Sequence, residues 1–305
     1  MSCEVDYKQF LDSKEPISSL QEKDWTLYGQ CSETYTYLND IPDSNRQDYF
    51  DIPYGEDSAQ KLDIHHLKST NKELKPVIFF IHGGGWTSED KSNTRFYALD
   101  WIQKGYTVVS INYRLAPNAV HPLQIEDCAL AFKWVLNNVK DFGGNPNEIV
   151  VIGHSAGAHL AALLVAGEKW HKKYGIDMKS VKCWIPVSGV FDLNLPENYI
   201  PEILNMSILA MLGDSDKTDC SPISYVTGNE PPCLILHGGD DWLVPRSNSI
   251  NFFNKLIEKG AKNAQIKLVP GYWHVNMMLG YDKEGHMPAK IITEYLAEML
   301  PTCNK

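Results

Sequence analysis

One serine of the sequence stands in a setting that favours nucleophilic catalysis. Ser155 lies within the segment GHSAG at residues 153–157. An apolar run ending at Ile152 precedes this segment, and an alanine- and leucine-rich run follows it. The order strand, sharp turn, helix is typical of a nucleophile elbow, in which a strained turn holds a serine at the top of a sheet. Glycine is expected at both ends because a Cβ atom there would collide where strand and helix meet.

A glycine-rich segment, HGGGW at residues 82–86, follows a shorter apolar run. Acyl transfer needs N–H donors directed at the oxygen atom that becomes negatively charged, and consecutive glycines let the backbone supply them. The predicted donors of this oxyanion hole are the N–H groups of Gly84, Gly85 and Ala156, with Gly83 as an alternative. A phosphate-binding loop is disfavoured because no Gly-Lys-Ser/Thr follows the glycines.

A serine nucleophile needs a base, and the base needs a carboxylate that orients it. Behind a nucleophile elbow the carboxylate precedes the histidine along the chain. Asp241 follows an apolar run and is the predicted acid, with Asp240 and Asp192 as alternatives. His274 follows the last predicted strand and is the predicted base, with His286 as the alternative.

Aromatic side chains flank these segments. Trp86, Trp242 and Trp273 are predicted to line a substrate pocket, together with Tyr272. Ordinary core packing is the competing interpretation, since aromatic side chains are common in cores. No group of histidines, cysteines or acids has the spacing of metal ligands, so neither a metal site nor a cofactor is predicted.

The elements that must position these residues alternate along the chain. Two short strands, over 48–53 and 61–67, are predicted to form an antiparallel edge pair. Further strands are predicted over 77–81, 106–112, 148–152, 183–187, 233–237 and 265–269, and helices over 94–104, 122–138, 246–259 and 287–300, with another beginning at Ser155. Apolar strands separated by helices predict an α/β fold, with a mostly parallel central sheet flanked by helices and the site at the carboxyl ends of the strands.

Two regions depart from this alternation. Residues 1–45 are polar and aromatic and are predicted to form a small N-terminal arm or cap, so that 46–305 is the catalytic domain. Residues 192–230 are rich in Pro, Asn and Asp and contain one apolar stretch, 203–212. A segment of this length between two strands is either a cap or a disordered loop, and the apolar stretch favours a cap insertion.

The composition narrows the class of partner and the location. A formal net charge of −10 disfavours nucleic acid and anionic membranes. No apolar run approaches the roughly 18 residues that span a bilayer. Seven widely spaced cysteines without a C-x-x-C pair, and a beginning that lacks the features of a signal peptide, predict reduced thiols and a cytoplasmic location. A homodimer is the candidate assembly.

Six segments together resemble the α/β-hydrolase superfamily, in the esterase/lipase branch related to hormone-sensitive lipase. They are HGGGW (82–86), YRLAP (113–117), FGGNP (142–146), GHSAGAHLAALL (153–164), HGGDDWLVP (237–245) and GYWH (271–274). Relatives of hormone-sensitive lipase usually carry Asp before the serine, where this chain has His154. The segment GHSAGAHLA resembles instead the kynurenine formamidase and feruloyl-esterase-like group, whereas Gly85 is more typical of general carboxylesterases.

The residues and the resemblance together predict a serine carboxylesterase that hydrolyses short-chain or aryl carboxylic esters through an acyl-enzyme. His274 would deprotonate Ser155, and Asp241 would hold the imidazole in place. One alternative is an arylformamidase that acts on N-formylkynurenine, since that reaction is also an acyl transfer. Another is a non-catalytic binding protein of the same fold. The predicted partner is therefore a small-molecule ester or aryl formamide.

Overall fold

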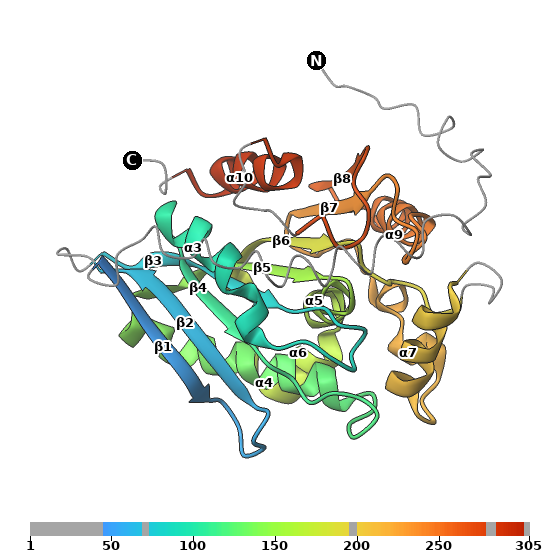
Figure 1. Cartoon of the computed structure of the whole chain (residues 1–305), viewed down its shortest axis with the longest axis horizontal. Helices are drawn as coiled ribbons and strands as arrows, with labels where there is room; N and C mark the ends of the chain where they lie inside the picture. The colour runs from blue at the N-terminus through green and yellow to red at the C-terminus, as the bar shows by residue number, and fades with distance from the viewer. Residues whose placement is uncertain (1–44, 69–72, 195–199, 279–284, 302–305) are drawn as a thin grey trace. The chain divides into compact units, whose positions relative to one another are not determined.

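Figure 1 shows a computed structural model of the chain, which describes residues 45–68, 73–194, 200–278 and 285–301. The predicted N-terminal arm therefore lies outside the described residues, except for residue 45.

Eight strands of the described residues form one sheet, in the order β1-β2-β4-β3-β5-β6-β7-β8. Their bounds are β1 Arg46–Pro53, β2 Lys61–Leu67, β3 Lys75–Ile81, β4 Thr107–Ile111, β5 Gly144–His154, β6 Val181–Val187, β7 Cys233–Gly238 and β8 Ala264–Val269. The pairs β1–β2 and β2–β4 are antiparallel, and every other neighbouring pair is parallel. The predicted antiparallel edge and parallel centre are both confirmed.

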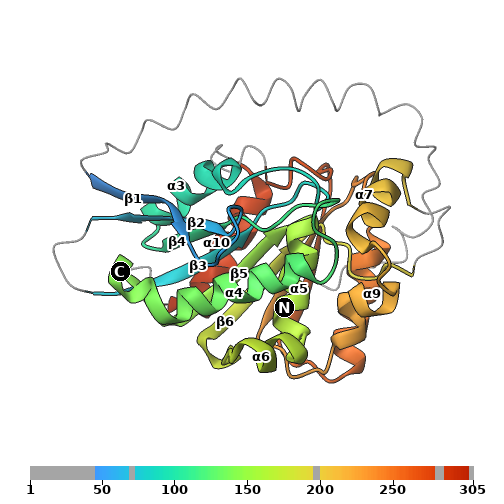
Figure 2. The ribbon, with the colours of Figure 1, turned by 90° about the horizontal axis from the view of Figure 1, so that it is seen from below.

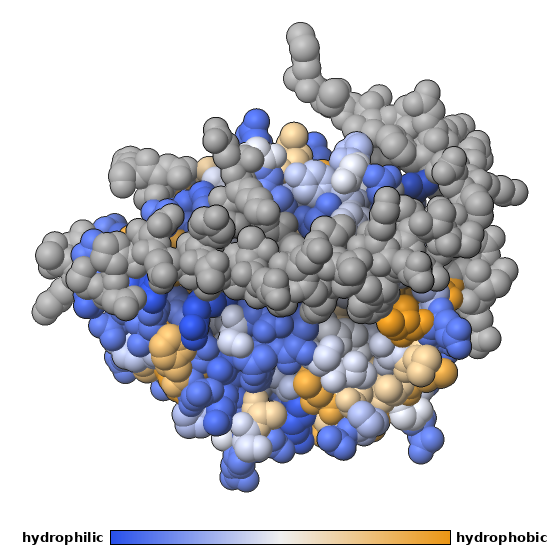
Figure 3. All heavy atoms as spheres, in the orientation of Figure 1, coloured by the Kyte–Doolittle hydropathy of each residue, from blue (hydrophilic) through white to orange (hydrophobic). Residues whose placement is uncertain are grey.

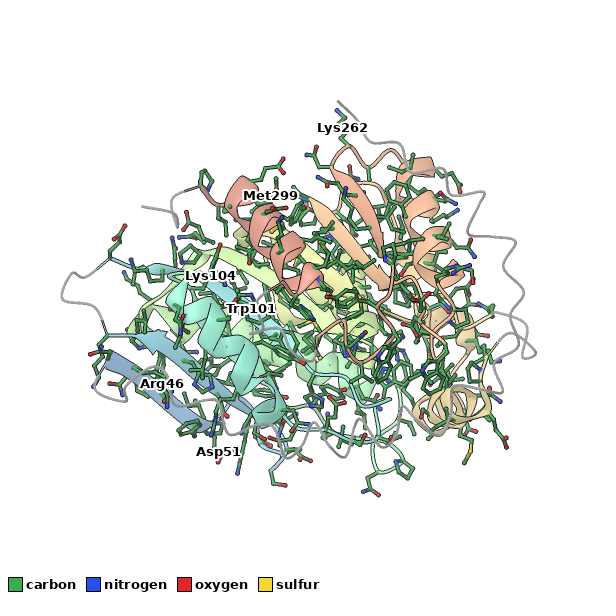
Figure 4. All side chains as sticks on the ribbon, turned by 45° about the horizontal axis from the view of Figure 1, so that its top comes forward. Arg46, Asp51, Trp101, Lys104, Lys262 and Met299 are labelled. Carbon is green, nitrogen blue, oxygen red and sulfur yellow. The ribbon has the colours of Figure 1, made fainter. Side chains whose placement is uncertain are left out.

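Helices cover both faces of this sheet. Their bounds are α3 Arg95–Gln103, α4 Leu123–Asn138, α5 Ala156–Ala166, α6 Glu168–Tyr174, α7 Glu202–Leu212, α8 Lys217–Cys220, α9 Ser247–Glu258 and α10 Met287–Met299. Figure 2 shows α3 and α10 on one face and α4, α5 and α6 on the other. On the first face, Trp101 of α3 is fully buried and its ring centroid lies 5.7 Å from that of Phe80 in β3 (Figure 4).

The strands and the helix around Ser155 are apolar because they are covered on all sides. Residues Val77–Ile81 of β3 and Ile149–Ile152 of β5 are at most 1% exposed. All residues of α5 are buried as well, which agrees with its lack of a polar face. The nucleophile candidate therefore follows a buried stretch of β5 and precedes a fully buried helix.

The described part of the predicted insertion, 192–194 and 200–230, is largely folded. It contains α7 and α8, and α7 buries Leu204, Ile208, Met211 and Leu212. The insertion is attached to the loop before α4, because the N–H of His121 donates to the carbonyl of Met211 at 2.7 Å. This part of the chain is helical, which favours a cap over a loop without structure.

A substitution at Gly157 tests the close contact between α5 and the sheet. A Cβ atom at this position would lie 2.1 Å from the carbonyl oxygen of Ile81 and 2.4 Å from that of His82. We expect Gly157→Ala to lower the free energy of unfolding by about 3 kcal/mol, because backbone must move to admit the methyl group. Urea denaturation measures this change.

The control is Gly260→Ala, at a surface position where a Cβ atom would meet nothing within 4 Å. Its positive φ of 94° alone should cost about 1 kcal/mol. Equal losses in the two variants would contradict a steric origin at Gly157.

Candidate active site

Ser155 occupies a strained turn between β5 and α5. Its φ of 54° and ψ of −120° lie outside the regions that non-glycine residues ordinarily adopt. The turn is held from two sides, because the N–H of Ser155 donates to the carbonyl of Val187 and its own carbonyl accepts from Ala158, each at 2.9 Å. A Cβ atom on Gly153 would lie 2.2 Å from the carbonyl oxygen of Gly157, so the predicted need for glycine is confirmed. The geometry is that of a nucleophile elbow.

Ser155, His274 and Asp241 lie in one hydrogen-bonded row. The Nε2 atom of His274 is 2.8 Å from the Oγ atom of Ser155, and its Nδ1 atom is 2.8 Å from the Oδ2 atom of Asp241. The side chains of His274 and Asp241 are 3% and 0% exposed. An imidazole in this position can take the hydroxyl proton at Nε2 while the carboxylate holds its Nδ1–H.

The carboxylate of Asp241 is fixed and kept ionised by its surroundings. Its Oδ1 atom accepts from the backbone N–H groups of Leu243 and Val244, at 3.0 and 2.9 Å. The Nε2 atom of His237 lies 3.2 Å from Oδ2. Burial alone would raise the pKa of Asp241, but the charge of His274 and the hydrogen bonds from both histidines hold that pKa well below its usual value. The sequence did not reveal the contact with His237.

The alternatives to Asp241 and His274 make other contacts. The side chain of Asp240 is exposed, and Oδ1 of Asp192 accepts from the N–H of Asn194. The ring of His286 caps α10, where its Nδ1 atom accepts from the N–H of Ala289. The structure therefore brings together the three residues that the sequence favours and none of these alternatives.

The HGGG segment forms a tight loop beside Ser155. Gly84 and Gly85 have φ values of 83° and 58°, a region that glycine adopts readily. A Cβ atom on Gly83 would lie 3.3 Å from the Cβ atom of Ser155, so the loop runs directly against the serine. Within the described residues, no acceptor binds the N–H groups of Gly84, Gly85 or Ala156. These three predicted donors are thus available to a ligand oxygen.

Tyr113 is hydrogen-bonded to the backbone of this loop. Its hydroxyl donates to the carbonyl of Gly83 at 2.8 Å and lies 3.1 Å from that of His82. Its ring stacks on the His82 ring, with centroids 4.4 Å apart. Tyr113 opens the YRLAP segment on which the resemblance partly depends, but no local pattern of the sequence assigns it a role beside the glycine loop. A buried tyrosine that braces a glycine loop limits the motion of the predicted donors.

The three tryptophans differ in their surroundings. Trp86 is fully buried, and its indole N–H donates to Nδ1 of His159 at 3.2 Å. The Nε2 atom of His159 in turn lies 2.8 Å from the carbonyl oxygen of Cys220 in α8. Trp86 therefore packs in the core and presents no surface to a ligand in this structure. Trp242 and Trp273 are partly exposed and stay candidates for lining the pocket.

The helical insertion borders the HGGG loop. A Cβ atom on Gly85 would lie 2.9 Å from the Oγ atom of Ser207 in α7. Apolar side chains gather at the surface around this helix (Figure 3), where Ile203, Met206 and Leu209 are 43, 64 and 54% exposed. This proximity supports a contribution of the insertion to the substrate pocket.

Comparison with known proteins connects these features to a family. Residues 62–256, more than half of the chain, match the BD-FAE family model. The chain belongs to the BD-FAE family. The matched residues include the HGGG loop, Ser155 and Asp241, whereas His274 follows them. The BD-FAE match thus covers the nucleophile elbow and the segment that carries the acid candidate.

Several esterases resemble this BD-FAE member in sequence. Esterase LipQ of Mycobacterium tuberculosis is 30% identical over 82% of the chain, and isoprenylcysteine alpha-carbonyl methylesterase ICME of Arabidopsis thaliana is 30% identical over 75%. The chain spans only 61% and 56% of the length of these two proteins.

The structure resembles solved esterases as well. It superposes on Esterase B from Lactobacillus rhamnosis with a TM-score of 0.76 at 20% identity, covering 96% of this chain and 95% of that one. Together with the sheet order, this likeness confirms the α/β-hydrolase fold. Within the described residues no helix combines the length and the hydropathy of a membrane span, and no three or more His, Cys, Asp and Glu side chains are grouped so that they could hold a metal ion.

Burial keeps three histidines of the BD-FAE site region neutral. It lowers the pKa of His82 to about 4 and the pKa values of His154 and His159 to about 3. In the unfolded chain each ring should titrate near 6.5. Between these pH values the unfolded state binds protons that the native state does not. The contribution of these histidines to the free energy of unfolding is therefore fully present above about pH 6.5 and decreases as the pH falls.

We expect His159→Gln to weaken this pH dependence. The variant should be less stable than the wild type at pH 7, because the indole N–H of Trp86 loses a well-placed acceptor. Between pH 7 and 5, however, it should lose about 2 kcal/mol less of its unfolding free energy, because one fewer buried ring resists protonation. Urea denaturation at both pH values measures the difference. An equal loss in both proteins would mean that native His159 takes up a proton over the same pH range as the unfolded chain.

Proposed function

We propose that this protein is a serine hydrolase of carboxylic esters. The observation that carries the proposal is the row of two 2.8 Å hydrogen bonds from Ser155 through His274 to Asp241, ending beside a glycine loop with free N–H groups. A nucleophile, a base, an orienting carboxylate and preorganised donors are the groups that acyl transfer requires. The names of LipQ and ICME, both esterases, support the same reaction class.

The proposed reaction proceeds through an acyl-enzyme. His274 removes the proton of Ser155 as the Oγ atom attacks the ester carbonyl carbon. The carbonyl oxygen becomes an anion and accepts hydrogen bonds from the N–H groups of Gly84, Gly85 and Ala156. The imidazolium of His274 then protonates the leaving alcohol. Water, activated by the same histidine, releases the acid and regenerates the serine.

Asp241 has two tasks in this scheme. It accepts the Nδ1–H of His274, which leaves the lone pair of Nε2 directed at the serine hydroxyl. It also stabilises the imidazolium that forms in the transition state. The second task requires an ionised carboxylate, and the depressed pKa of Asp241 supports this state throughout the neutral range.

The proposed substrates are short-chain or aryl esters, and the aryl formamide alternative uses the same groups. Relatives named as methylesterases act on esters with a one-carbon alcohol part, which supports a small leaving group. A reducing location such as the cytoplasm is part of the proposal. It is supported by Cys128, Cys183, Cys220 and Cys233, which are buried free thiols.

We expect the protein to hydrolyse p-nitrophenyl acetate and butyrate faster than the octanoate, with little cleavage of N-formylkynurenine. Ser155→Ala should lower every rate by at least about 10⁴-fold while leaving the thermal transition in place. Initial rates and a melting curve measure both effects. Formamide cleavage with a kcat/KM well above that of any ester would favour the arylformamidase alternative. Turnover that survives in Ser155→Ala would contradict the assignment of the nucleophile.

The two adjacent aspartates provide a matched pair. Asp241→Asn should lower kcat for p-nitrophenyl butyrate by about 10⁴-fold, because the amide no longer stabilises the imidazolium and favours the wrong tautomer. Asp240→Asn changes an exposed side chain one residue away and should keep the wild-type rate. A large loss in Asp240→Asn, or none in Asp241→Asn, would remove Asp241 from the proposed mechanism.

A further inference from the structure

His154 joins the nucleophile strand to the backbone of the proposed base. It is the last residue of β5 and directly precedes Ser155. Its Nε2 atom lies 2.9 Å from the carbonyl oxygen of His274, 120 residues away in sequence. Since a carbonyl oxygen can only accept, Nε2 of His154 carries the proton and donates.

The His154 ring is suited to this contact because it stays neutral. Its centroid lies 5.0 Å from that of His274. Burial, together with the positive charge that His274 can carry, lowers the pKa of His154 to about 3. A neutral ring keeps one donor and one acceptor, and it adds no positive charge beside the imidazolium that forms at His274 during the proposed reaction.

Two further hydrogen bonds connect the segment around His274 to elements other than β5. The N–H of Asp240, after β7, donates to the carbonyl of Tyr272 at 3.0 Å. The N–H of Met287, at the start of α10, donates to the Tyr272 hydroxyl at 3.0 Å. These bonds fix the segment to β7 and α10, but not to the strand that carries Ser155. Among the described residues, the bond from His154 ties the backbone of His274 to that strand.

We propose that His154 is a positioning residue for His274. By holding the carbonyl of His274, it sets the distance between the imidazole and Ser155 before any substrate binds. The inference rests on the proposed serine-hydrolase function, because only that function gives this distance a catalytic meaning. The proposal also gives a reason for histidine at position 154, because its ring is long enough to donate to the carbonyl of His274.

A matched pair of amides tests the proposal. Glutamine at position 154 can place its amide N–H near the position of the histidine Nε2 atom, whereas asparagine reaches only as far as Nδ1. We expect His154→Asn to lower kcat for p-nitrophenyl butyrate by about 10- to 100-fold with little change in KM, because the base is no longer held at its working distance. His154→Gln should recover most of that loss. Thermal melts of both variants report any general loss of stability, which the pair should share.

A second measurement does not require turnover. An imidazole Nδ1–H bound to a carboxylate gives a far-downfield proton NMR signal, which Asp241→Asn assigns by removing it. This signal should persist in the wild type and in His154→Gln, and it should broaden or vanish in His154→Asn. Wild-type kcat and an intact signal in His154→Asn, or equal losses in the two amide variants, would overturn the proposal. A wild type without ester turnover would contradict the proposed function instead, and the NMR comparison would still decide the role of His154.

Discussion

The close contact of α5 with the ends of β3 and β5 is the constraint on which the site depends. It exists because Gly153 and Gly157 carry no side chain and the helix backbone can approach the strand carbonyls. This approach forces the sharp turn at Ser155 and places the N–H of Ala156 at the start of the helix. The HGGG loop leaves the end of β3, so the same contact brings loop and serine together. One steric condition thus sets both the nucleophile and its oxyanion donors.

Neutral histidines form hydrogen bonds to the backbone of the segments around this contact. Three histidine rings, two of them buried and one partly buried, each contact a backbone carbonyl around the serine. They are His82, His154 and His159, next to the carbonyl groups of Gly83, His274 and Cys220. A neutral imidazole suits this task because it offers a donor without introducing a charge that burial would penalise. The segment of the base and the helical insertion are in this way bonded to the strand and the helix that flank Ser155, whereas the His82 bond lies within the glycine loop.

The sequence predicted the features that depend on local patterns. Apolar runs and glycine pairs were sufficient to predict the sheet and the turn at Ser155. Chain order favoured Asp241 and His274, and the structure places both in a hydrogen-bonded row with Ser155. What it did not predict depends on segments that meet only after folding. The contact between His154 and His274 spans 120 residues, and Tyr113 braces a carbonyl 30 residues away. Trp86 likewise contacts His159 of α5, 73 residues away in sequence, and no local pattern encodes this contact. The sequence alone therefore did not distinguish a pocket-lining Trp86 from one that packs in the core.

The order of the strands has a consequence for how the protein is made. Ser155 and the glycine loop belong to the centre of the sheet, whereas His274 follows β8, the edge strand that comes last in sequence among the described strands. A nascent chain can therefore build the elbow and still lack the base until β8 pairs with β7 and its following segment reaches back to β5. Contacts between residues far apart in sequence, such as that of His274 with Ser155, are slow to form. The proposed activity would therefore be absent from a chain in which β8 has not yet joined the sheet, even if its nucleophile elbow is already formed.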